Sequence, residues 1–390
     1  MKRGHLYFFA LIIVACLCID VIPLNFLRLF LAISVTLKSA IIFVLPVLIF
    51  GLIFSTFQRL GQGASKIFAI ALGLLCCSNF LATYMSHFVG EGVHSMDLSL
   101  AQVAAGNELV PLFNLQFPKI ISNAFAMIFG VICGIFVPKV SPTYSQKILN
   151  VFDIIVSRLL SYISFVIPFF LFGFILKMQY DGMVLLLVRQ YAIIVAVIIA
   201  TLAVYISLFY FIASGLHPEN AWRSMKNMIP AVICAFGSMS SASALPYTIV
   251  AVEKNTSNKS LAKSIVSITT NIHLLGDCIA IPIFIYAILK SFGLPQPSAA
   301  LYLIFVIQFV VAKFSVAAVP GGGIIVMLPI IERCFGFNDA MSSLIFSLYV
   351  LMDPICTSAN VLGNGAFAQL IDCIVCRFRL GNFSEESNVA

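Results

Sequence analysis

Asp353 lies in the middle of a long apolar stretch of sequence, 339–376. An ionised carboxylate in such surroundings costs several kcal/mol unless another group compensates its charge, and carboxylates within membrane segments therefore usually serve a function. We expect such a functional role for Asp353. The alternative is a structural pairing with a cation elsewhere in the chain.

Two other apolar stretches, 222–252 and 299–335, are each interrupted in the middle. The first contains Gly-Ser-Met-Ser-Ser-Ala-Ser-Ala-Leu-Pro at 237–246, and the second contains Val-Pro-Gly-Gly-Gly at 319–323. Proline lacks an N–H group and glycine is conformationally permissive, so both runs should end a helix. Non-helical backbone at membrane depth is tolerated only where it is buried in protein or lines a cavity. The pair of interrupted segments therefore predicts the binding site of a transporter.

The composition indicates which elements must position these residues. The chain has 390 residues, of which 61% are hydrophobic and 9% are charged, whereas about a quarter of the residues are charged in soluble proteins. Apolar stretches of about 20 residues cross a bilayer as helices, because backbone polar groups in lipid must be paired within the segment. We therefore predict an all-α integral membrane protein with eight transmembrane helices and two re-entrant helical hairpins. The predicted spans cover 6–27, 31–57, 66–89, 119–137, 148–176, 183–214, 260–292 and 339–376.

The net charge of +7 reflects the short connectors between the spans. With eight spans most of the basic residues fall on one side, and the stretch 90–118 on the other side contains no lysine or arginine. Cytoplasmic loops carry the excess of Lys and Arg, so both termini are predicted to be cytoplasmic in a plasma membrane, the inner membrane of a bacterium. No nucleic-acid partner is expected. The basic residues on the predicted cytoplasmic side are Lys2, Arg3, Arg59, Lys66, Lys139, Lys147, Arg223, Lys226, Lys254, Lys259, Lys263, Arg377 and Arg379.

Other function classes find little support in the sequence. The eleven cysteines are scattered through apolar segments, without the two Cys-x-x-Cys pairs of a zinc site, so we interpret them as reduced, buried thiols. The run after Lys2 and Arg3 resembles a signal peptide but lacks a small-residue cleavage site, and we interpret it as the first transmembrane helix. We find no His-Glu-x-x-His, Gly-x-Ser-x-Gly or nucleotide-binding glycine loop, so we expect neither an enzyme nor an organic cofactor.

The interrupted segments resemble those of a transporter family. The run at 237–246 resembles the tip of the first re-entrant hairpin of the dicarboxylate/amino acid:cation symporters, the glutamate-transporter homologues, and 318–323 resembles the tip of their second hairpin. Asp353 followed by Asn-Val-Leu-Gly-Asn at 360–364 is similar to the last helix of the family, and 260–292 occupies the place of the seventh helix with its unwound ion-binding motif. The likeness in hydropathy and hairpin order spans nearly the whole chain.

This resemblance implies a homotrimer with an elevator mechanism. Helices one, two, four and five would form a scaffold, and helices three, six, seven and eight with both hairpins would form a transport domain. By residue, this predicts 1–65 as scaffold helices one and two, 66–90 as transport-domain helix three, 91–182 as a loop and scaffold helices four and five, 183–376 as the remaining transport domain, and 377–390 as a cytoplasmic tail.

The resemblance also implies a substrate site. In the family, the position of Asp353 faces the amino group of the substrate, while free N–H groups at the hairpin tips suit its carboxylate. Serine hydroxyls at the first tip are expected to bind the same carboxylate; the alternative is that they bond back to their own helix. The glycines at 321–323 would let the second hairpin act as a gate. The expected substrate-binding residues are Ser240, Ser241, Ser243, Val319, Gly323, Asp353, Cys356, Thr357 and Asn360.

Cys356 departs from the family pattern. Family members that carry acidic substrates have an arginine here, which binds the side-chain carboxylate of the substrate, and Met239 replaces the first-hairpin arginine of some relatives. Thr357 keeps a hydroxyl available beside Cys356. We therefore expect a small neutral amino acid, such as serine, alanine, threonine or cysteine. The alternative is that Lys313 takes over from the arginine and that the substrate is an acidic amino acid or a dicarboxylate.

The cation sites that the resemblance implies are incomplete. Aligned on Gly276, the family motif Asn-Met-Asp-Gly-Thr corresponds to His273-Leu-Leu-Gly-Asp277, so that Leu275 replaces the aspartate. A register shift of two residues is the alternative, which puts Asn271 at the asparagine of the motif and His273 at its aspartate.

Two further positions depart from the cation sites of the family. Cys76 and Cys77 stand where the third helix usually offers hydroxyls, and thiols are poor ligands for sodium. Lys313 stands where one sodium site often has a serine, and its ammonium group could substitute for an ion. The expected coupling residues are Asn271, His273, Gly276, Asp277, Lys313, Asn360 and Asn364, with Na⁺ as the only expected metal ion.

Weakened sodium sites favour coupling to fewer sodium ions or to protons. His273 and Asp277 are four residues apart, which places them on one face of a helix, and histidine changes charge near neutral pH. We expect this pair to titrate; equally open is a hydrogen-bonded pair that only stabilises the unwound segment. A sensor or channel without coupled transport is the second alternative for the function of the chain.

Overall fold

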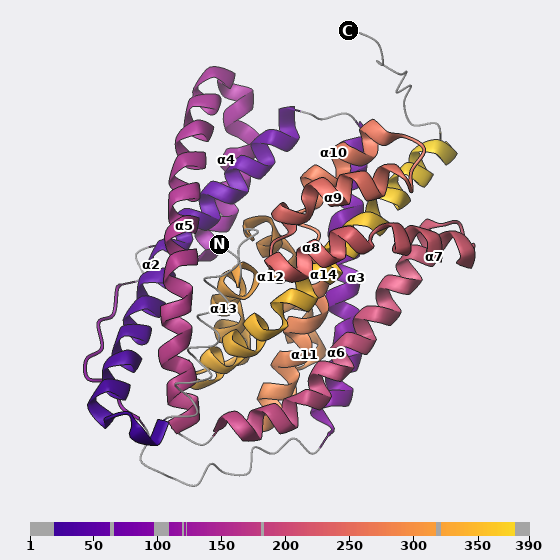
Figure 1. The fold of residues 1–390 in the computed structure, drawn as a ribbon. Helices are drawn as coiled ribbons and strands as arrows, with labels where there is room; N and C mark the ends of the chain where they lie inside the picture. The colour runs from indigo at the N-terminus through magenta and orange to yellow at the C-terminus, as the bar shows by residue number, and fades with distance from the viewer. Residues whose placement is uncertain are drawn as a thin grey trace.

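The computed structural model describes residues 19–62, 66–96, 109–118, 121, 123–180, 183–316 and 321–378. Every regular element in these ranges is a helix (Figure 1), as the composition predicts. The elements are η1 (Ile19–Val21), α2 (Leu24–Gln62), α3 (Lys66–His94), α4 (Asn123–Val140), α5 (Pro142–Tyr180), α6 (Met183–Ala213), α7 (Pro218–Asn227), α8 (Ile229–Ser238), α9 (Ser241–Glu253), α10 (Lys259–Thr269), α11 (Leu275–Ser291), α12 (Ala299–Ala312), η2 (Lys313–Ser315), α13 (Gly322–Phe335) and α14 (Asp339–Phe378).

Membrane-spanning character is clear for part of this set. Within the described ranges, three helices are long and apolar enough to cross a bilayer, namely Ala69–His94, Tyr191–Ala213 and Asp339–Phe378. The predicted total of eight spans stays a prediction.

The boundary between the first two predicted spans differs from the structure. The span predicted at 6–27 lies largely outside the described residues, and α2 begins at Leu24 instead of residue 31. Pro23 explains this start, because its carbonyl oxygen accepts hydrogen bonds from the N–H groups of Phe26 and Leu27, at 2.9 and 3.4 Å. A missing N–H group costs nothing at the beginning of a helix.

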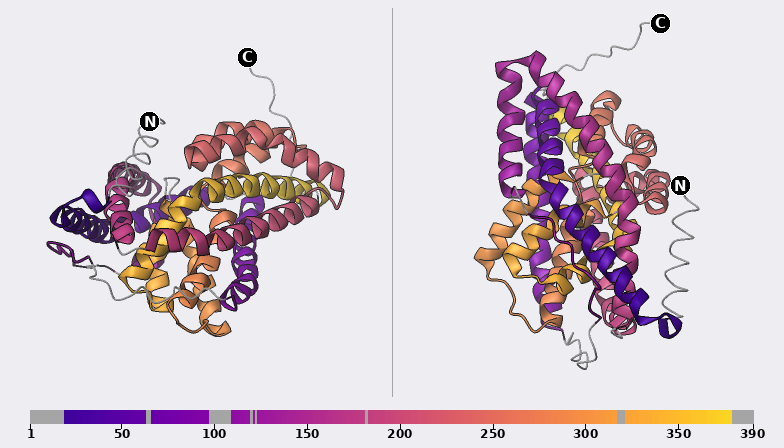
Figure 2. Two further views of the ribbon diagram at one scale, coloured as in Figure 1. Left: turned by 60° about the horizontal axis from the view of Figure 1, so that its bottom comes forward. Right: turned by 90° about the vertical axis from the view of Figure 1, so that its left-hand side faces the viewer.

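Helices α2, α4 and α5 pack against one another, and we call them the first bundle (Figures 1 and 2). Glycines permit their close approach. A Cβ atom on Gly134 would lie 3.0 Å from the carbonyl oxygen of Phe54, and a Cβ atom on Gly173 would lie 2.3 Å from that of Phe30. Small residues at such crossings let membrane helices pack backbone to backbone.

Helices α3 and α6–α14 form the second bundle, with α11 at its centre. All residues of α11 except Lys290 are buried, against neighbours that include α3, α6 and α14. A helix that is buried on every side belongs to the interior of the protein. Figure 1 shows α14 running obliquely through this bundle.

The first interrupted segment folds as a pair of helices. α8 ends at Ser238 and α9 begins at Ser241, and Met239 between them takes a left-handed conformation with φ 50°. The Ser240 Oγ atom accepts a hydrogen bond from the Ser243 N–H group at 3.4 Å and thereby caps α9. The predicted break at this position is confirmed.

The second interrupted segment also forms two helices. α12 continues directly into η2, which ends at Ser315, and α13 follows Gly321, whose φ of 73° favours glycine. Residues 317–320, which include the predicted site residue Val319, lie outside the described residues. Whether either pair re-enters the membrane stays a prediction.

The span predicted at 260–292 is divided into α10 and α11 by an unwound segment, 270–274. The carbonyl oxygen of Ile272 in this segment accepts a hydrogen bond from the Asn79 amide of α3 at 2.9 Å. Buried backbone groups that leave a helix need such partners, and this bond attaches the unwound segment to α3.

Candidate functional site

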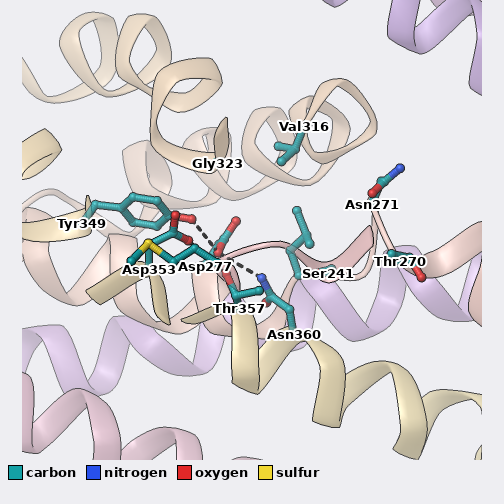
Figure 3. Close-up of a pocket in the computed structure, with 12 residues that line it drawn as sticks. Ser241, Thr270, Asn271, Asp277, Val316, Gly323, Tyr349, Asp353, Thr357 and Asn360 are labelled. Carbon is teal, nitrogen blue, oxygen red and sulfur yellow. Dashed lines mark hydrogen bonds between the residues drawn. The ribbon is translucent and has the colours of Figure 1, made fainter. Parts of the chain in front are cut away.

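A small cavity lies where the two helix pairs meet the unwound segment and α14 (Figure 3). Its volume is about 30 Å³, which is room for about two water molecules. A free amino acid is several times larger, so the walls must move apart to admit one. The lining residues are Met239, Ser241, Thr270, Asn271, Leu274, Asp277, Val316, Gly323, Tyr349, Asp353, Thr357 and Asn360.

Three of the described helices begin at this cavity. Ser241, Asp277 and Gly323 line it from the first turns of α9, α11 and α13. The first turn of a helix has N–H groups without intrahelical partners and a partial positive charge, and both features favour anions. The cavity therefore combines helix N-termini with the carboxylates of two aspartates.

Asp353 contributes one of these carboxylates and is 4% exposed. Its Oδ1 atom accepts a hydrogen bond from the Thr357 hydroxyl at 3.0 Å, and its Oδ2 atom accepts one from the Gly321 N–H group at 2.8 Å. Both donors are neutral, and within the described part of the chain no cationic side chain pairs with this carboxylate. A carboxylate has about four acceptor positions, so Asp353 can accept further donors.

Asp277 contributes the second carboxylate and has a fuller set of partners. Its Oδ1 atom accepts hydrogen bonds from the Tyr349 hydroxyl at 2.9 Å and from the Asn360 amide at 3.3 Å. The Asn360 Oδ1 atom accepts the N–H group of Gly276 at 2.7 Å, which fixes the orientation of this amide. Figure 3 shows these side chains from α11 and α14 facing one another.

Lys313 is the cationic partner of Asp277. Its Nζ atom lies 3.2 Å from Asp277 Oδ2 and 4.2 Å from the centre of the Phe309 ring. The Lys313 side chain is 0% exposed, so this is a buried ion pair supported by a cation–π contact. Lys313 does not line the cavity itself.

Gly323 is required by a close approach at this point. A Cβ atom there would lie 2.5 Å from both Asp277 Oδ2 and the Tyr349 hydroxyl oxygen. No side chain fits in that space, so the first turn of α13 can rest against the Asp277 carboxylate only because residue 323 is glycine.

The three serines of the first pair have different positions. Ser241 lines the cavity and is buried, whereas Ser243 is exposed and Ser240 caps α9. The sequence predicts a binding role for all three serines, but only Ser241 lines the cavity. Hydroxyls near the start of a helix readily cap it. Here the Ser240 hydroxyl accepts the N–H group of Ser243 in the helix that it caps.

Cys356 is fully buried and does not line the cavity. Its backbone lies against Gly276, where a Cβ atom would be 2.2 Å from the Cys356 carbonyl oxygen. Thr357 and Asn360, by contrast, line the cavity from the same helix. Position 356 therefore serves the contact between α14 and α11 in this conformation.

The expectation that His273 and Asp277 share one helical face is wrong. His273 precedes the first residue of α11, in the unwound segment, so the helical period does not connect the two residues. The His273 Nε2 atom pairs with the Ser78 hydroxyl at 2.9 Å, and its ring lies 4.8 Å from that of Phe367. Asp277 contacts other residues, namely Lys313, Tyr349 and Asn360.

Asn364 and Asn271 differ in their surroundings. Asn364 is buried and its Oδ1 atom has no hydrogen-bond partner among the described residues, although its side chain lies close to His273. Asn271 is exposed and lines the cavity from the unwound segment.

The cysteines of α3 are not the residues that face the unwound segment. Cys77 is exposed and Cys76 is partly buried, whereas Asn79 and Thr83 are fully buried on the face toward α11. The buried face of α3 therefore lies two to three residues beyond the cysteines, and the apolar sequence of this helix does not reveal which face is buried. This face carries an amide and hydroxyls, so the argument from soft thiols does not apply.

Tyr349 and Thr270 are lining residues that sequence reasoning missed. Tyr349 stands four residues before Asp353 on α14, and residues at this spacing share a helix face. The spacing could therefore have indicated Tyr349. No comparable signal marks Thr270, because its position depends on where α10 unwinds.

The described residues contain no group of three or more His, Cys, Asp or Glu side chains that could hold a metal ion. A cation at the cavity would have to be bound by carboxylate oxygens together with neutral oxygens. Asp277 and Tyr349 offer such oxygens side by side. This donor set suits a hard monovalent ion better than a transition metal.

Comparisons with known proteins agree with this architecture. The sequence profile of the Sodium:dicarboxylate symporter family matches residues 5–374. The chain is 23% identical to excitatory amino acid transporter 1 of Rattus norvegicus over 261 residues, which cover 64% of this chain and 47% of the rat protein. The Homo sapiens protein of the same name matches with the same identity and coverage. The chain thus spans about half the length of the curated relatives it matches. Because the family profile covers nearly all of its residues, the chain belongs to the sodium:dicarboxylate symporter family.

Proposed function

We propose that this protein is a secondary active transporter that carries a small neutral amino acid, such as serine, alanine, threonine or cysteine, across a membrane with sodium ions or protons. One observation carries the proposal. The described lining of the cavity contains two carboxylates and three helix N-termini, but no cationic side chain.

The ammonium group of a bound amino acid would pair with Asp353. This carboxylate is buried and has only neutral partners among the described residues, whereas Asp277 already pairs with Lys313. A buried carboxylate without a counter-ion favours a cationic ligand strongly. Thr357 holds Asp353 in place and would orient it toward the ligand.

The carboxylate group of the same amino acid would bind at the helix N-termini. Ser241 and Gly323 line the cavity from the first turns of α9 and α13. Their N–H groups and the Ser241 hydroxyl are donors for an anion. An amino acid carries one charge of each sign, which matches this pair of subsites.

An acidic substrate is the alternative. A second carboxylate on the ligand would need a fixed positive charge for a bidentate or single ion pair. Lys313 is the candidate for this charge, but its ammonium group pairs with Asp277, and Lys313 does not line the cavity. A substrate with a neutral side chain therefore suits this cavity better.

We assign the first bundle, with the predicted helix at 6–27, to a scaffold, and the second bundle to a domain that moves with its cargo. The tight packing within each bundle supports this division. The second helix pair would be the gate, because the Gly321 N–H group closes on Asp353. We further propose a homotrimer in a plasma membrane with both termini in the cytoplasm.

The driving ion is sodium, as the family membership suggests, or the proton. The contacts of His273 with Ser78 and Phe367 favour a structural role for this histidine. Proton coupling through His273 and Asp277 predicts that replacing both with Asn changes the pH dependence of uptake. An unchanged pH dependence would argue against the proton.

Uptake of radiolabelled serine, alanine and aspartate into proteoliposomes tests the proposal, with sodium and proton gradients imposed separately. We expect accumulation of serine or alanine, little accumulation of aspartate, and dependence on one of the two gradients. Strong accumulation of aspartate would overturn the neutral substrate. Accumulation of no amino acid under either gradient would overturn coupled transport and favour a sensor or a channel.

A further inference from the structure

Lys313 has surroundings that an ordinary lysine avoids. It lies in η2, at the inner end of the first helix of the second pair, and its side chain is fully buried. Its ammonium group contacts Asp277 Oδ2 at 3.2 Å and the Phe309 ring at 4.2 Å. Lysine is almost never buried unless it is paired, so the Asp277 carboxylate is the feature that permits this position.

The charges around Asp277 balance with Lys313 included. The other two donors to this carboxylate, the Tyr349 hydroxyl and the Asn360 amide, are neutral. Within the described residues Lys313 is therefore the only cation that compensates Asp277. If the ammonium group were absent, a buried negative charge would remain at the edge of the cavity, and a mobile cation would have to neutralise it.

The atoms that would receive such a cation are already arranged. Asp277 offers two carboxylate oxygens and Tyr349 a hydroxyl oxygen within 2.9 Å of Oδ1. The close approach at Gly323 brings the backbone of α13 against the same carboxylate. Hard monovalent cations such as Na⁺ favour oxygen ligands of this kind.

We infer that the Lys313 ammonium group is a built-in counter-ion, which occupies a monovalent-cation site at Asp277 and replaces one coupling ion of the transport cycle. The tethered ammonium travels with the second bundle and is not released on either side. It therefore neutralises Asp277 without drawing on an ion gradient. The inference deepens the proposed function, because it rests on the proposed coupling of transport to ions.

The inference predicts a gain of sodium binding when the ammonium group is removed. In Lys313→Ser, the Asp277 carboxylate and the vacated volume would accept Na⁺. A ligand that binds only the folded protein raises its melting temperature. Na⁺ at about 100 mM should therefore raise the melting temperature of Lys313→Ser by about 3 °C or more beyond the rise seen for the wild type. Choline, which is too large for the site, should have no such effect.

Three control variants of the purified full chain separate this effect from general destabilisation. Lys313→Arg keeps the charge and should respond to Na⁺ as the wild type does. The double variant Asp277→Asn, Lys313→Met removes both charges and should gain no response. Lys290→Ser changes the one residue of α11 that is not buried and tests for a general effect of losing a lysine. If Lys313→Ser is not recovered in folded form, Lys313→Gln takes its place in the same comparison.

Transport gives the second measurement. In proteoliposomes, Lys313→Ser should couple one further Na⁺ to each amino acid, as read from the sodium gradient that balances a known substrate gradient. Equal sodium responses of Lys313→Ser and the wild type in both measurements would overturn the inference. An equal gain in the double variant would also overturn it, because the cation would then bind elsewhere.

The failure of the proposed function has a different signature. Wild-type vesicles that accumulate no amino acid under any gradient would remove the transport proposal. The melting comparison needs no uptake, so it would still decide whether Lys313 occupies a cation site at Asp277.

Discussion

Asp277 and Asp353 line the same cavity with different partners. Asp277 has a lysine, a tyrosine and an asparagine as donors, whereas Asp353 has a threonine and a backbone N–H group. The same residue type therefore has two roles, which its surroundings decide. Asp277 holds the two helices of the second pair near α14, and Asp353 is left to meet a cationic ligand.

Loss of the Asp353 charge should strongly reduce uptake without unfolding the protein. In Asp353→Asn the amide oxygen can still accept the Gly321 N–H group, but it no longer attracts an ammonium group. A hydrogen bond to a charged group contributes about 1.5–3 kcal/mol, so we expect uptake at low substrate concentration to fall tenfold or more. Initial rates of serine or alanine uptake measure the effect.

Thr357→Val provides a graded comparison for this prediction. It removes one neutral hydrogen bond to Asp353, worth about 1 kcal/mol, and should reduce uptake less than Asp353→Asn does. If Thr357→Val were as harmful as Asp353→Asn, or if Asp353→Asn kept normal uptake, Asp353 would not be the ammonium-binding group.

Gly323→Ala should destabilise the closed cavity. Its Cβ atom would lie 2.5 Å from Asp277 Oδ2 and from the Tyr349 hydroxyl, and overpacking of this kind costs about 1–3 kcal/mol. We expect a lower melting temperature and slower uptake. The matched control is Gly237→Ala at the first pair, where a Cβ atom meets nothing within 4 Å and alanine favours the helix by up to about 1 kcal/mol. Equal melting temperatures for the two variants would refute the close approach at Gly323.

Sequence reasoning identified several of the residues that line the cavity, because they belong to short motifs. Asp353, Thr357 and Asn360 are close together on one helix, and the resemblance to the last helix of the family marks this stretch. The partner of Asp277 could not be derived in this way. Lys313 is 36 residues away along the chain, and no helical period relates the two.

At the scale of elements, the two helix pairs depend on residues that end helices. The second pair was predicted at 299–335, and α12 begins at Ala299 while α13 ends at Phe335. The first was predicted at 222–252, and α8 with α9 covers most of it. Glycine and proline act through the local backbone, so their effect is visible in the sequence alone.

The phase of a uniformly apolar helix is harder to derive. Cys76 and Cys77 were expected to face the interior, but Asn79 and Thr83 do. Most residues of α3 are apolar, so the hydrophobic period gives little contrast between its faces. The residue at which α10 unwinds is equally hard to derive from the sequence. For this reason His273 was paired with Asp277, although it lies in the unwound segment before α11.

The junction between α9 and α10 should depend on Asp372 of α14. The two carboxylate oxygens of Asp372 accept the N–H groups of Ser257 and Asn258, at 2.7 and 3.1 Å. In Asp372→Ala both N–H groups lose their acceptor, which costs about 1–3 kcal/mol. We expect a lower melting temperature and faster trypsin cleavage at the neighbouring Lys254 and Lys259.

Glu253→Ala is the control for this junction, since it removes a nearby carboxylate from the last residue of α9. It should leave both the melting temperature and the cleavage rate close to those of the wild type. Comparable effects of the two variants would mean that the loss of negative charge, and not the two hydrogen bonds, weakens the junction.

At the scale of the whole molecule, relative motion of the two bundles can be tested at their contact. The rings of Phe57 in α2 and Phe314 in η2 lie 5.3 Å apart and join the bundles. In a variant without other accessible cysteines, we expect a short thiol cross-linker between Phe57→Cys and Phe314→Cys to reduce uptake by about tenfold or more. A reducing agent should restore uptake when the linker is cleavable.

A second pair of cysteines controls for the chemistry. The rings of Phe50 in α2 and Phe152 in α5 lie 5.0 Å apart within the first bundle. Cross-linking Phe50→Cys to Phe152→Cys should leave uptake largely intact, because these helices are expected to stay together. Inhibition by both cross-links, or by neither, would contradict a cycle in which one bundle moves past the other.

The chain links between the bundles restrict that motion. α2 and α3 are separated by residues 63–65, and α5 and α6 by residues 181–182, so the described ends of these helices can separate by no more than about 15 Å and 11 Å. The link between α3 and α4 has about 28 residues and a reach of roughly 90 Å. In Figure 1 the neighbouring ends of α2 and α3 lie at the opposite end of the molecule from those of α5 and α6. Rotation about the line that joins them needs no slack in the chain, whereas a longer translation requires the helix turns beside these links to unwind.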